Sequence, residues 1–251
     1  MIIIISNQKI NKNFPQGSKK SLRWYKAHFP TKDDVYNKKK ELDCRKVLVG
    51  EATPGYLFHP LSPPQIKYLM PNVKLIVLLR NPINRAFSHY QHEFRVHREN
   101  LTFEEAVKAE SSRIAGSFEK ILSQKNFFCP EYHYHSYLER GKYYDQLVRW
   151  YKYFPKDRFL VIKSEELFEH PEAIYKQVLK FLDLPRYEKT EFEKLNQGSY
   201  NTSCAVGFEH ISQWLGEYFF KENQKLYELL GVDYNWELEL YPKKLEPQKP
   251  R

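Results

Sequence analysis

The sequence predicts an α/β fold in which a parallel sheet is flanked by helices. Short apolar runs of strand length occur at residues 46–50, 73–79 and 158–163, and polar or turn-forming residues bound each of them. Longer helix-like segments lie between these runs. Continuous apolar strands are typical of sheets that are buried on both faces, and strands that alternate with helices favour parallel pairing.

The second apolar run leads directly into a predicted helix. Asn81 suits the N-cap position and Pro82 suits the first helical position. Four apolar residues then recur at the spacing of a core-facing stripe: Ile83, Phe87, Tyr90 and Phe94. Three polar residues share the adjoining face: Asn84, Ser88 and His92.

Later segments predict further helices at residues 143–154 and 171–184, and a last one that ends at Gly231, a residue suited to a helix C-terminus. The proline-rich residues 59–64 predict a loop. The opening "MIIIIS" can supply an edge strand.

The chain shows no internal repeat and no second domain. We expect one domain over residues 18–236, preceded by an irregular N-terminal remnant (1–17) and followed by a basic C-terminal tail (237–251). A chain of 251 residues that is 41% hydrophobic can bury a sizeable core.

The composition gives no sign of a membrane span, a leader or a metal site. No run reaches the roughly 18 apolar residues that a bilayer requires. The first residues are too few for a signal peptide and lack its basic start, so we expect a cytoplasmic protein. The three cysteines are widely spaced without a C-x-x-C pair, which predicts neither a disulfide framework nor a zinc site.

A net charge of +9 and a pI near 9.2 predict an anionic partner. Nucleic acid, an anionic membrane surface, a nucleotide and an acidic polysaccharide all fit, and charge alone does not choose among them. The 19 tyrosines and 17 phenylalanines would suit a nucleic-acid binder, but they fall mostly on helix core faces. Because no nucleic-acid-binding motif is present either, we expect no nucleic-acid partner.

Arg80 stands at the carboxyl end of the second predicted strand, and Ser88 follows within the next helix. Ligands of open α/β sheets collect at such strand ends, where helix N-termini favour anions. A guanidinium and a hydroxyl that converge can hold a phosphate by charge-assisted hydrogen bonds. The alternative is that Arg80 covers a sheet edge and Ser88 is merely a small helix residue; the spacing leaves both open.

The segment "LRNPINRAFSHYQHEFR" resembles the 3′-phosphate-binding motif of sulfotransferases that use 3′-phosphoadenosine 5′-phosphosulfate (PAPS), in particular the heparan-sulfate-sulfotransferase-like branch. Four further segments resemble successive blocks of that family in the same order: "GEATPGYLFHP", "YLERGKYYDQLVRWYKYFP", "FLVIKSEELFEHP" and "NQGSYN". The likeness runs from about residue 22 to residue 236.

This resemblance implies a P-loop-like sulfotransferase fold and transfer of a sulfuryl group from PAPS, the co-substrate, without a metal. The acceptor would be a hydroxyl or amine of a carbohydrate, lipid or small metabolite, and the basic surface is compatible with an anionic glycan. By the resemblance, Arg80 and Ser88 would grip the 3′-phosphate. Gly198 and Tyr200 would belong to the family's late cofactor-contacting loop.

Two further residues are candidates for the reacting centre. His92 matches a Tyr-Gln-His segment that N-sulfotransferase relatives carry near that centre; the alternative is a surface histidine without a role. Glu51, with Thr53, follows the first predicted strand at the same sheet end as Arg80, where we expect acceptor contacts or catalysis. The alternative for Glu51 and Thr53 is that they cap a helix or a turn.

The family's front end is missing from this sequence. Relatives begin with a strand, a glycine-threonine-serine phosphosulfate loop with its lysine and, in the heparan branch, a glutamate. Here residues 18–30 already resemble the region downstream of that loop, and "QGSKKS" has a single glycine, so we expect the first strand and the loop to be missing. We therefore expect a truncated member with impaired transfer; the alternative is an inactive pseudoenzyme that binds a nucleotide or a sulfated glycan.

Overall fold

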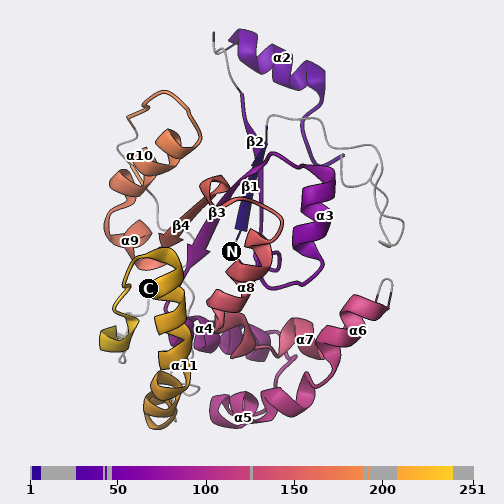
Figure 1. Ribbon diagram of the computed structural model, residues 1–251, viewed down its shortest axis with the longest axis vertical. Coiled ribbons are helices and arrows are strands. Elements are labelled where there is room, and N and C mark those ends of the chain that lie inside the picture. The colour runs from indigo at the N-terminus through magenta and orange to yellow at the C-terminus, as the bar shows by residue number, and fades with distance from the viewer. Residues whose placement is uncertain are drawn as a thin grey trace, which may run out of the picture. The chain divides into compact units, whose positions relative to one another are not determined.

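Strands and helices alternate along the chain, as the sequence predicts (Figure 1). The computed structural model describes residues 2–6, 27–41, 43, 47–124, 127–188, 191–192 and 208–239. The chain divides into two units. The first unit comprises Met1–Leu79, Lys120–Phe127 and Gln146–Leu195. The second unit comprises Arg80–Glu119, Phe128–Asp145 and Asn196–Arg251.

A four-stranded sheet lies in the first unit, in the order β2-β1-β3-β4. The strands are β1 (Ile2–Ser6), β2 (Val49–Thr53), β3 (Lys74–Leu79) and β4 (Phe159–Lys163). β3 and β4 are parallel, whereas β1 is antiparallel to both of its neighbours. It follows that β2, β3 and β4 all run in the same direction. The predicted α/β class with parallel strands is confirmed for these three strands.

The expectation that "MIIIIS" supplies an edge strand is wrong, because β1 lies between β2 and β3. Consecutive isoleucines are β-branched and apolar, a pattern that suits a strand with neighbours on both sides better than an edge. Ile2 pairs with Thr53 and Val77, and Ser6 pairs with Val49. The chain therefore leaves β1 at the sheet end where β2 and β3 begin.

Two other local expectations need correction. Glu51 and Thr53 lie inside β2 and not after it, because the pairing with β1 extends to Thr53. The loop expected at residues 59–64 ends earlier, since Ser62 already opens helix α3 (Ser62–Leu69). The two prolines after Ser62 are tolerated because the first helical turn needs no N–H donors for its own hydrogen bonds.

Helices cover the sheet of the first unit. Ile174 of α10 (Pro171–Phe181) packs in a cluster with Ile76 and Ile162 of the sheet. Figure 1 shows α9 (Ser164–Glu169) and α10 beside β4 and α3 on the other side of the sheet. The fully buried Trp150, on α8 (Tyr143–Tyr151), donates its indole N–H to the Leu57 carbonyl over 3.2 Å.

The first unit also includes α2 (Lys32–Glu41), which buries none of its side chains. The remaining short elements of the chain are α6 (Ser117–Ser123), α7 (Pro130–Tyr134), η1 (Glu139–Gly141), η2 (Lys156–Arg158) and η4 (Trp236–Glu239). Within the described ranges, no helix is long and apolar enough to cross a membrane.

The core of the second unit joins α4 (Pro82–Arg95), α5 (Phe103–Arg113) and α11 (Phe208–Leu230). The predicted stripe of α4 is confirmed: three of its residues are buried and the fourth packs at the margin. The Phe87 ring lies 5.2 Å from Phe103 and 4.6 Å from Phe208, centroid to centroid. As predicted, Gly231 terminates α11: it follows Leu230, and its φ of +66° is a left-handed conformation that favours glycine.

Gly141 provides a test of packing in this core. A Cβ at Gly141 would lie 2.6 Å from the Phe219 ring and 3.1 Å from Pro82 Cβ. Because Phe219 is fully buried, its ring has little room to withdraw. We expect Gly141→Ala to lower the free energy of unfolding by about 1–3 kcal/mol, measured by urea denaturation. Gly55→Ala is the control, because a Cβ there meets nothing within 4 Å; equal losses in the two variants would contradict this account.

Candidate functional site

Asn81 fixes the start of α4, as predicted. Its side-chain Oδ1 accepts hydrogen bonds from the backbone N–H groups of Ile83 (3.0 Å) and Asn84 (3.3 Å). Its Nδ2 donates to the carbonyl of Trp236 over 3.3 Å. Asn81 is buried, so these bonds satisfy polar atoms that would otherwise be costly to bury. The first turn of α4 is therefore held in one place relative to the end of the second unit's chain.

Arg80 lies one residue before this capped helix. Its carbonyl accepts a hydrogen bond from the hydroxyl of Tyr143 over 2.8 Å, which fixes the backbone at this point. The side chain is half-buried, and within the described ranges no carboxylate forms an ion pair with it. Arg80 thus precedes a capped helix N-terminus, a place that favours anions, and no carboxylate of the described ranges neutralises its charge.

The structure places three of the predicted site residues together on one stretch of chain. Arg80, Ser88 and His92 belong to the second unit, with Ser88 half-buried and His92 exposed on α4. Ser88 and His92 are four residues apart and share a helix face. Glu51 belongs to the first unit, where its carboxylate accepts a hydrogen bond from the Tyr56 hydroxyl over 3.0 Å. Gly198 and Tyr200 lie outside the described residues.

Sequence reasoning did not anticipate that α4 also carries a half-buried charge. The guanidinium of Arg85 donates to the Tyr137 carbonyl, and its Nε has no hydrogen-bond partner. Burial lowers the pKa of Arg85. Glu110 on α5 faces the same region; burial raises its pKa to about 7, although the backbone N–H groups of Leu138 and Glu139 bond to it.

His89 is a second polar residue of α4 that is largely shielded from water, with 13% of its side chain exposed. Its ring packs edge-on against Tyr137, with centroids 5.0 Å apart, and its Nε2 lies 3.6 Å from Glu93 Oε1. Burial lowers the pKa of His89 to about 4, because the charged ring would lose its water. Burial by itself would raise the pKa of Glu93, but hydrogen bonds from His89 and Arg98 outweigh it and hold that pKa at about 2. At neutral pH a neutral imidazole therefore lies beside an ionised carboxylate.

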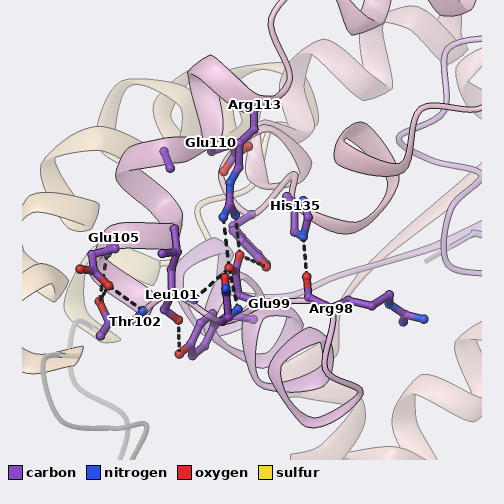
Figure 2. A network of polar contacts seen from close by, with 12 residues as sticks. Arg98, Glu99, Leu101, Thr102, Glu105, Glu110, Arg113 and His135 are labelled. Carbon is purple, nitrogen blue, oxygen red and sulfur yellow. Dashed lines mark hydrogen bonds and ion pairs between the residues drawn. The ribbon is translucent and has the colours of Figure 1, made fainter.

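The chain turns sharply after α4, and a polar network holds this turn (Figure 2). His97 has a φ of 57°, and the N–H of Arg98 donates back to the Glu93 carbonyl over 2.9 Å, which together close the helix in a Schellman motif. The buried carboxylate of Glu99 accepts from Arg113 (2.6 Å) and from the Tyr137 hydroxyl (2.9 Å).

The same network extends to both sides of the turn. His135 Nε2 donates to the carbonyl of Arg98 over 2.9 Å, and Thr102 and Glu105 form a capping box at the start of α5. Figure 2 shows the Arg98 side chain directed away from the Glu99–Arg113 pair. The network thus fixes the backbone of Arg98 and leaves its guanidinium outside the network.

The fold is of the α/β class, with an arginine directly before a capped helix and a hydroxyl on that helix. A family model described as the sulfotransferase domain matches residues 23–203, which is more than half of the sequence. The chain belongs to the sulfotransferase family.

Several curated proteins are similar to this chain. A membrane-associated sulfotransferase, kil1, of Dictyostelium discoideum is 24% identical over 86% of this chain and 57% of its own length. A bifunctional heparan sulfate N-deacetylase/N-sulfotransferase of Caenorhabditis elegans is 28% identical over 67% of this chain and 17% of its own. The heparan sulfate glucosamine 3-O-sulfotransferase 6 of Mus musculus is 26% identical over 87% of this chain and 62% of its own. The chain thus spans less than two thirds of each of these relatives.

A solved structure shows the same fold. The crystal structure of a sulfotransferase from Alicyclobacillus acidocaldarius matches with a TM-score of 0.57 at 24% identity, over 90% of this chain and 81% of its own. The expected sulfotransferase fold is confirmed by this likeness. Among the residues that the structure describes, no three histidine, cysteine or acidic side chains are grouped as metal ligands.

The buried His89 makes stability depend on pH. Its pKa of about 4 in the folded chain lies below the ordinary value of 6.5, so the unfolded chain binds more protons between these two values. The free energy of unfolding should therefore fall, by about 3 kcal/mol from this residue, as the pH drops from 6.5 to 4. Urea denaturation at several pH values, for the natural chain and for His89→Gln, measures the difference.

In that comparison His89→Gln should show a shallower loss than the natural chain, because glutamine does not titrate. The raised pKa of Glu110 acts in the opposite direction between pH 4.5 and 7, but it is present in both proteins and cancels. His170→Gln, at an exposed position, is the control and should keep the full pH dependence. Parallel curves for the natural chain and His89→Gln would exclude a neutral, buried His89.

Proposed function

We propose that the second unit binds the 3′-phosphate of PAPS through Arg80 and Ser88, in an enzyme fold that transfers sulfuryl groups to a carbohydrate. The observation that carries this proposal is the half-buried Arg80, without a carboxylate partner in the described ranges, directly before the capped N-terminus of α4. Membership of the sulfotransferase family supports it. Two similar proteins are named as heparan sulfate sulfotransferases, which supports a carbohydrate acceptor.

The charges around Arg80 favour a phosphate at this place. The free N–H groups of a helix N-terminus carry a partial positive charge, and a guanidinium can bind two phosphate oxygens at once. Burial lowers the pKa of Arg85, and repulsion from Arg80 lowers it further, so the two cations are close enough to act on each other. A dianionic 3′-phosphate would relieve this repulsion, whereas a nucleotide without that phosphate would not.

In the proposed reaction, an oxygen or nitrogen of the acceptor attacks the sulfur of PAPS. A new bond forms to sulfur while the bond from sulfur to the phosphate oxygen breaks, which releases 3′-phosphoadenosine 5′-phosphate (PAP). The acceptor proton must go to a base. We propose His92 for this role, because it is exposed one turn beyond Ser88 on the same face of α4.

We further propose that residues 1–251 alone turn over slowly. They contain no glycine-threonine-serine segment to hold the phosphosulfate. Three backbone donors and a lysine at about 1.5 kcal/mol each amount to roughly 6 kcal/mol of donor binding, or on the order of ten-thousandfold in affinity. The same lack favours the second candidate function, a protein that binds the nucleotide and does not transfer sulfate.

Titration with PAP in a calorimeter tests the donor site. Arg80→Ala should weaken PAP binding by a factor of about ten to a hundred, because a charge-assisted hydrogen bond contributes about 1.5–3 kcal/mol. Ser88→Ala should weaken it by less than about tenfold, since its hydroxyl is neutral. Lys152→Ala removes an exposed cation elsewhere and should leave the affinity unchanged.

Adenosine 5′-phosphate, which lacks the 3′-phosphate, is the matched ligand control. Its weaker binding should not change in Arg80→Ala. If the variant lost affinity for both ligands equally, Arg80 would not read the 3′-phosphate. A parallel assay with labelled PAPS and N-sulfated heparosan separates the two candidate functions: slow transfer supports the enzyme, and PAP binding without transfer supports the binding protein.

A further inference from the structure

A group of cationic and aromatic side chains lies at the far end of α4 and on α7, and we call it the Arg95 patch. It consists of His92, Arg95, Arg98, Phe128, His133 and Tyr134, all in the second unit. The ring of Phe128 lies 5.4 Å from His133 and 6.1 Å from Tyr134, between centroids. The guanidinium of Arg98 stacks 4.3 Å from the centre of the Tyr134 ring. Phe128 is 55% exposed, so one of these rings is open to solvent.

The surroundings of the patch cancel only part of its positive charge. Arg98 forms an ion pair with Glu93 over 2.6 Å. Arg95, by contrast, is exposed, and within the described part of the chain it has no carboxylate partner. Glu131, on α7, accepts a hydrogen bond from the Cys129 thiol over 3.4 Å. One cation of the patch is therefore neutralised, and Arg95 remains for an outside anion.

Arg95 also contacts His92, the histidine that we propose as the base. Its Nη2 lies 3.3 Å from Nδ1 of His92. A guanidinium only donates and a neutral imidazole has one lone pair, so this bond places the lone pair on Nδ1 and the proton on Nε2, which lies 3.9 Å from Glu93 Oε1. While Arg95 makes this contact, the lone pair on Nδ1 cannot take a proton from an acceptor.

The position of the patch follows from helix geometry. Ser88, His92 and Arg95 are spaced i, i+4 and i+7 and share one face of α4. With a rise of about 1.5 Å per residue, His92 lies about 6 Å and Arg95 about 10 Å along the axis from Ser88. The turn that follows is fixed by the Schellman motif and by the bond from His135 to the Arg98 carbonyl (Figure 2). The cations are thus held on a rigid backbone beyond the proposed phosphate site.

We propose that the Arg95 patch binds an acidic sugar residue of the acceptor glycan. Arg95 pairs with a sulfate or carboxylate of that residue, and the exposed face of Phe128 packs against the C–H groups of the sugar ring. When Arg95 turns to the acceptor's anion, it releases Nδ1 of His92. Arg95 is then a positioning residue that frees the base only when an acidic acceptor is in place. This inference rests on the proposed function for the role of His92, but the binding itself does not depend on it.

Binding of a heparin-derived hexasaccharide, measured by calorimetry on the full chain, tests the patch. Arg95→Gln should weaken this binding about tenfold to a hundredfold, and Arg95→Lys should restore part of it because the charge returns. Phe128→Ala should weaken it by about threefold to tenfold, because a buried aromatic contact of this kind contributes about 0.5–1.5 kcal/mol.

Two controls on α11 match these changes in the same unit. Lys221→Gln removes one exposed positive charge, and Phe220→Ala removes a ring that is 50% exposed. Both should leave the affinity for the hexasaccharide unchanged. Because all four positions are exposed, circular dichroism and thermal unfolding should show natural stability in every variant.

Several results would overturn the proposal. One is the absence of hexasaccharide binding by the natural chain, and another is an equal loss of hexasaccharide affinity in Arg95→Gln and Lys221→Gln. A third is a loss of single-stranded DNA affinity in Arg95→Gln as large as its loss of hexasaccharide affinity, which would indicate a general anionic contact. PAP titration separates this proposal from the donor site. PAP binding that depends on Arg80, together with hexasaccharide binding that ignores Arg95, refutes the patch alone. Hexasaccharide binding that depends on Arg95, without any PAP binding, refutes the donor site and supports the patch as a glycan site.

Discussion

The carboxylate of Glu99 is the contact on which the second unit's polar architecture depends. It joins the turn after α4, the end of α5 through Arg113 and the segment at residue 137 through Tyr137. A buried carboxylate is costly unless hydrogen bonds satisfy it, and here a guanidinium, a phenol and two backbone N–H groups do so. Burial by itself would raise the pKa of Glu99, yet these bonds lower it, so the charge is retained inside the fold. Since the three segments share one acceptor, the turn that carries Arg98 has little freedom to move.

Helix α4 separates two kinds of polar residue. Arg85 and His89 are half-buried and contact protein groups, Ser88 is half-buried, and His92 is exposed. The half-buried cation contributes positive potential and cannot reach a ligand directly, and the outer residues can form bonds with one. In the proposed donor site, the cation behind the helix face attracts the anion and the donors in front position it. The aromatic rings at the far end of α4 add apolar area, which a free phosphate would not need but a sugar would.

The parts of this structure that depend on local pattern were predictable from the sequence. The Asn81-Pro82 start, the apolar stripe of α4 and the end of α11 at Gly231 follow from hydrogen-bond needs and spacing within a few residues. The position of β1 was not predictable, because strand order depends on pairing with residues far along the chain. The roles of Arg85 and Glu99 were not predictable for the same reason, since their partners Tyr137 and Arg113 lie 52 and 14 residues away in the sequence. Periodicity marks which face of a helix is apolar, and it carries no information about which buried charge meets which partner.

The side chain of Asn81 both accepts and donates hydrogen bonds, and this restricts the residue types that can replace it. Asparagine, aspartate, serine and threonine all serve as helix N-caps in general, since each offers an oxygen acceptor. At this position the side chain must also donate to the carbonyl of Trp236. An ionised aspartate has no donor and would set a negative charge beside the place proposed for the phosphate, and a hydroxyl is too short to serve both partners. Of the four common caps, only the carboxamide supplies an acceptor and a donor from one planar group. Few substitutions at residue 81 would therefore keep both hydrogen bonds.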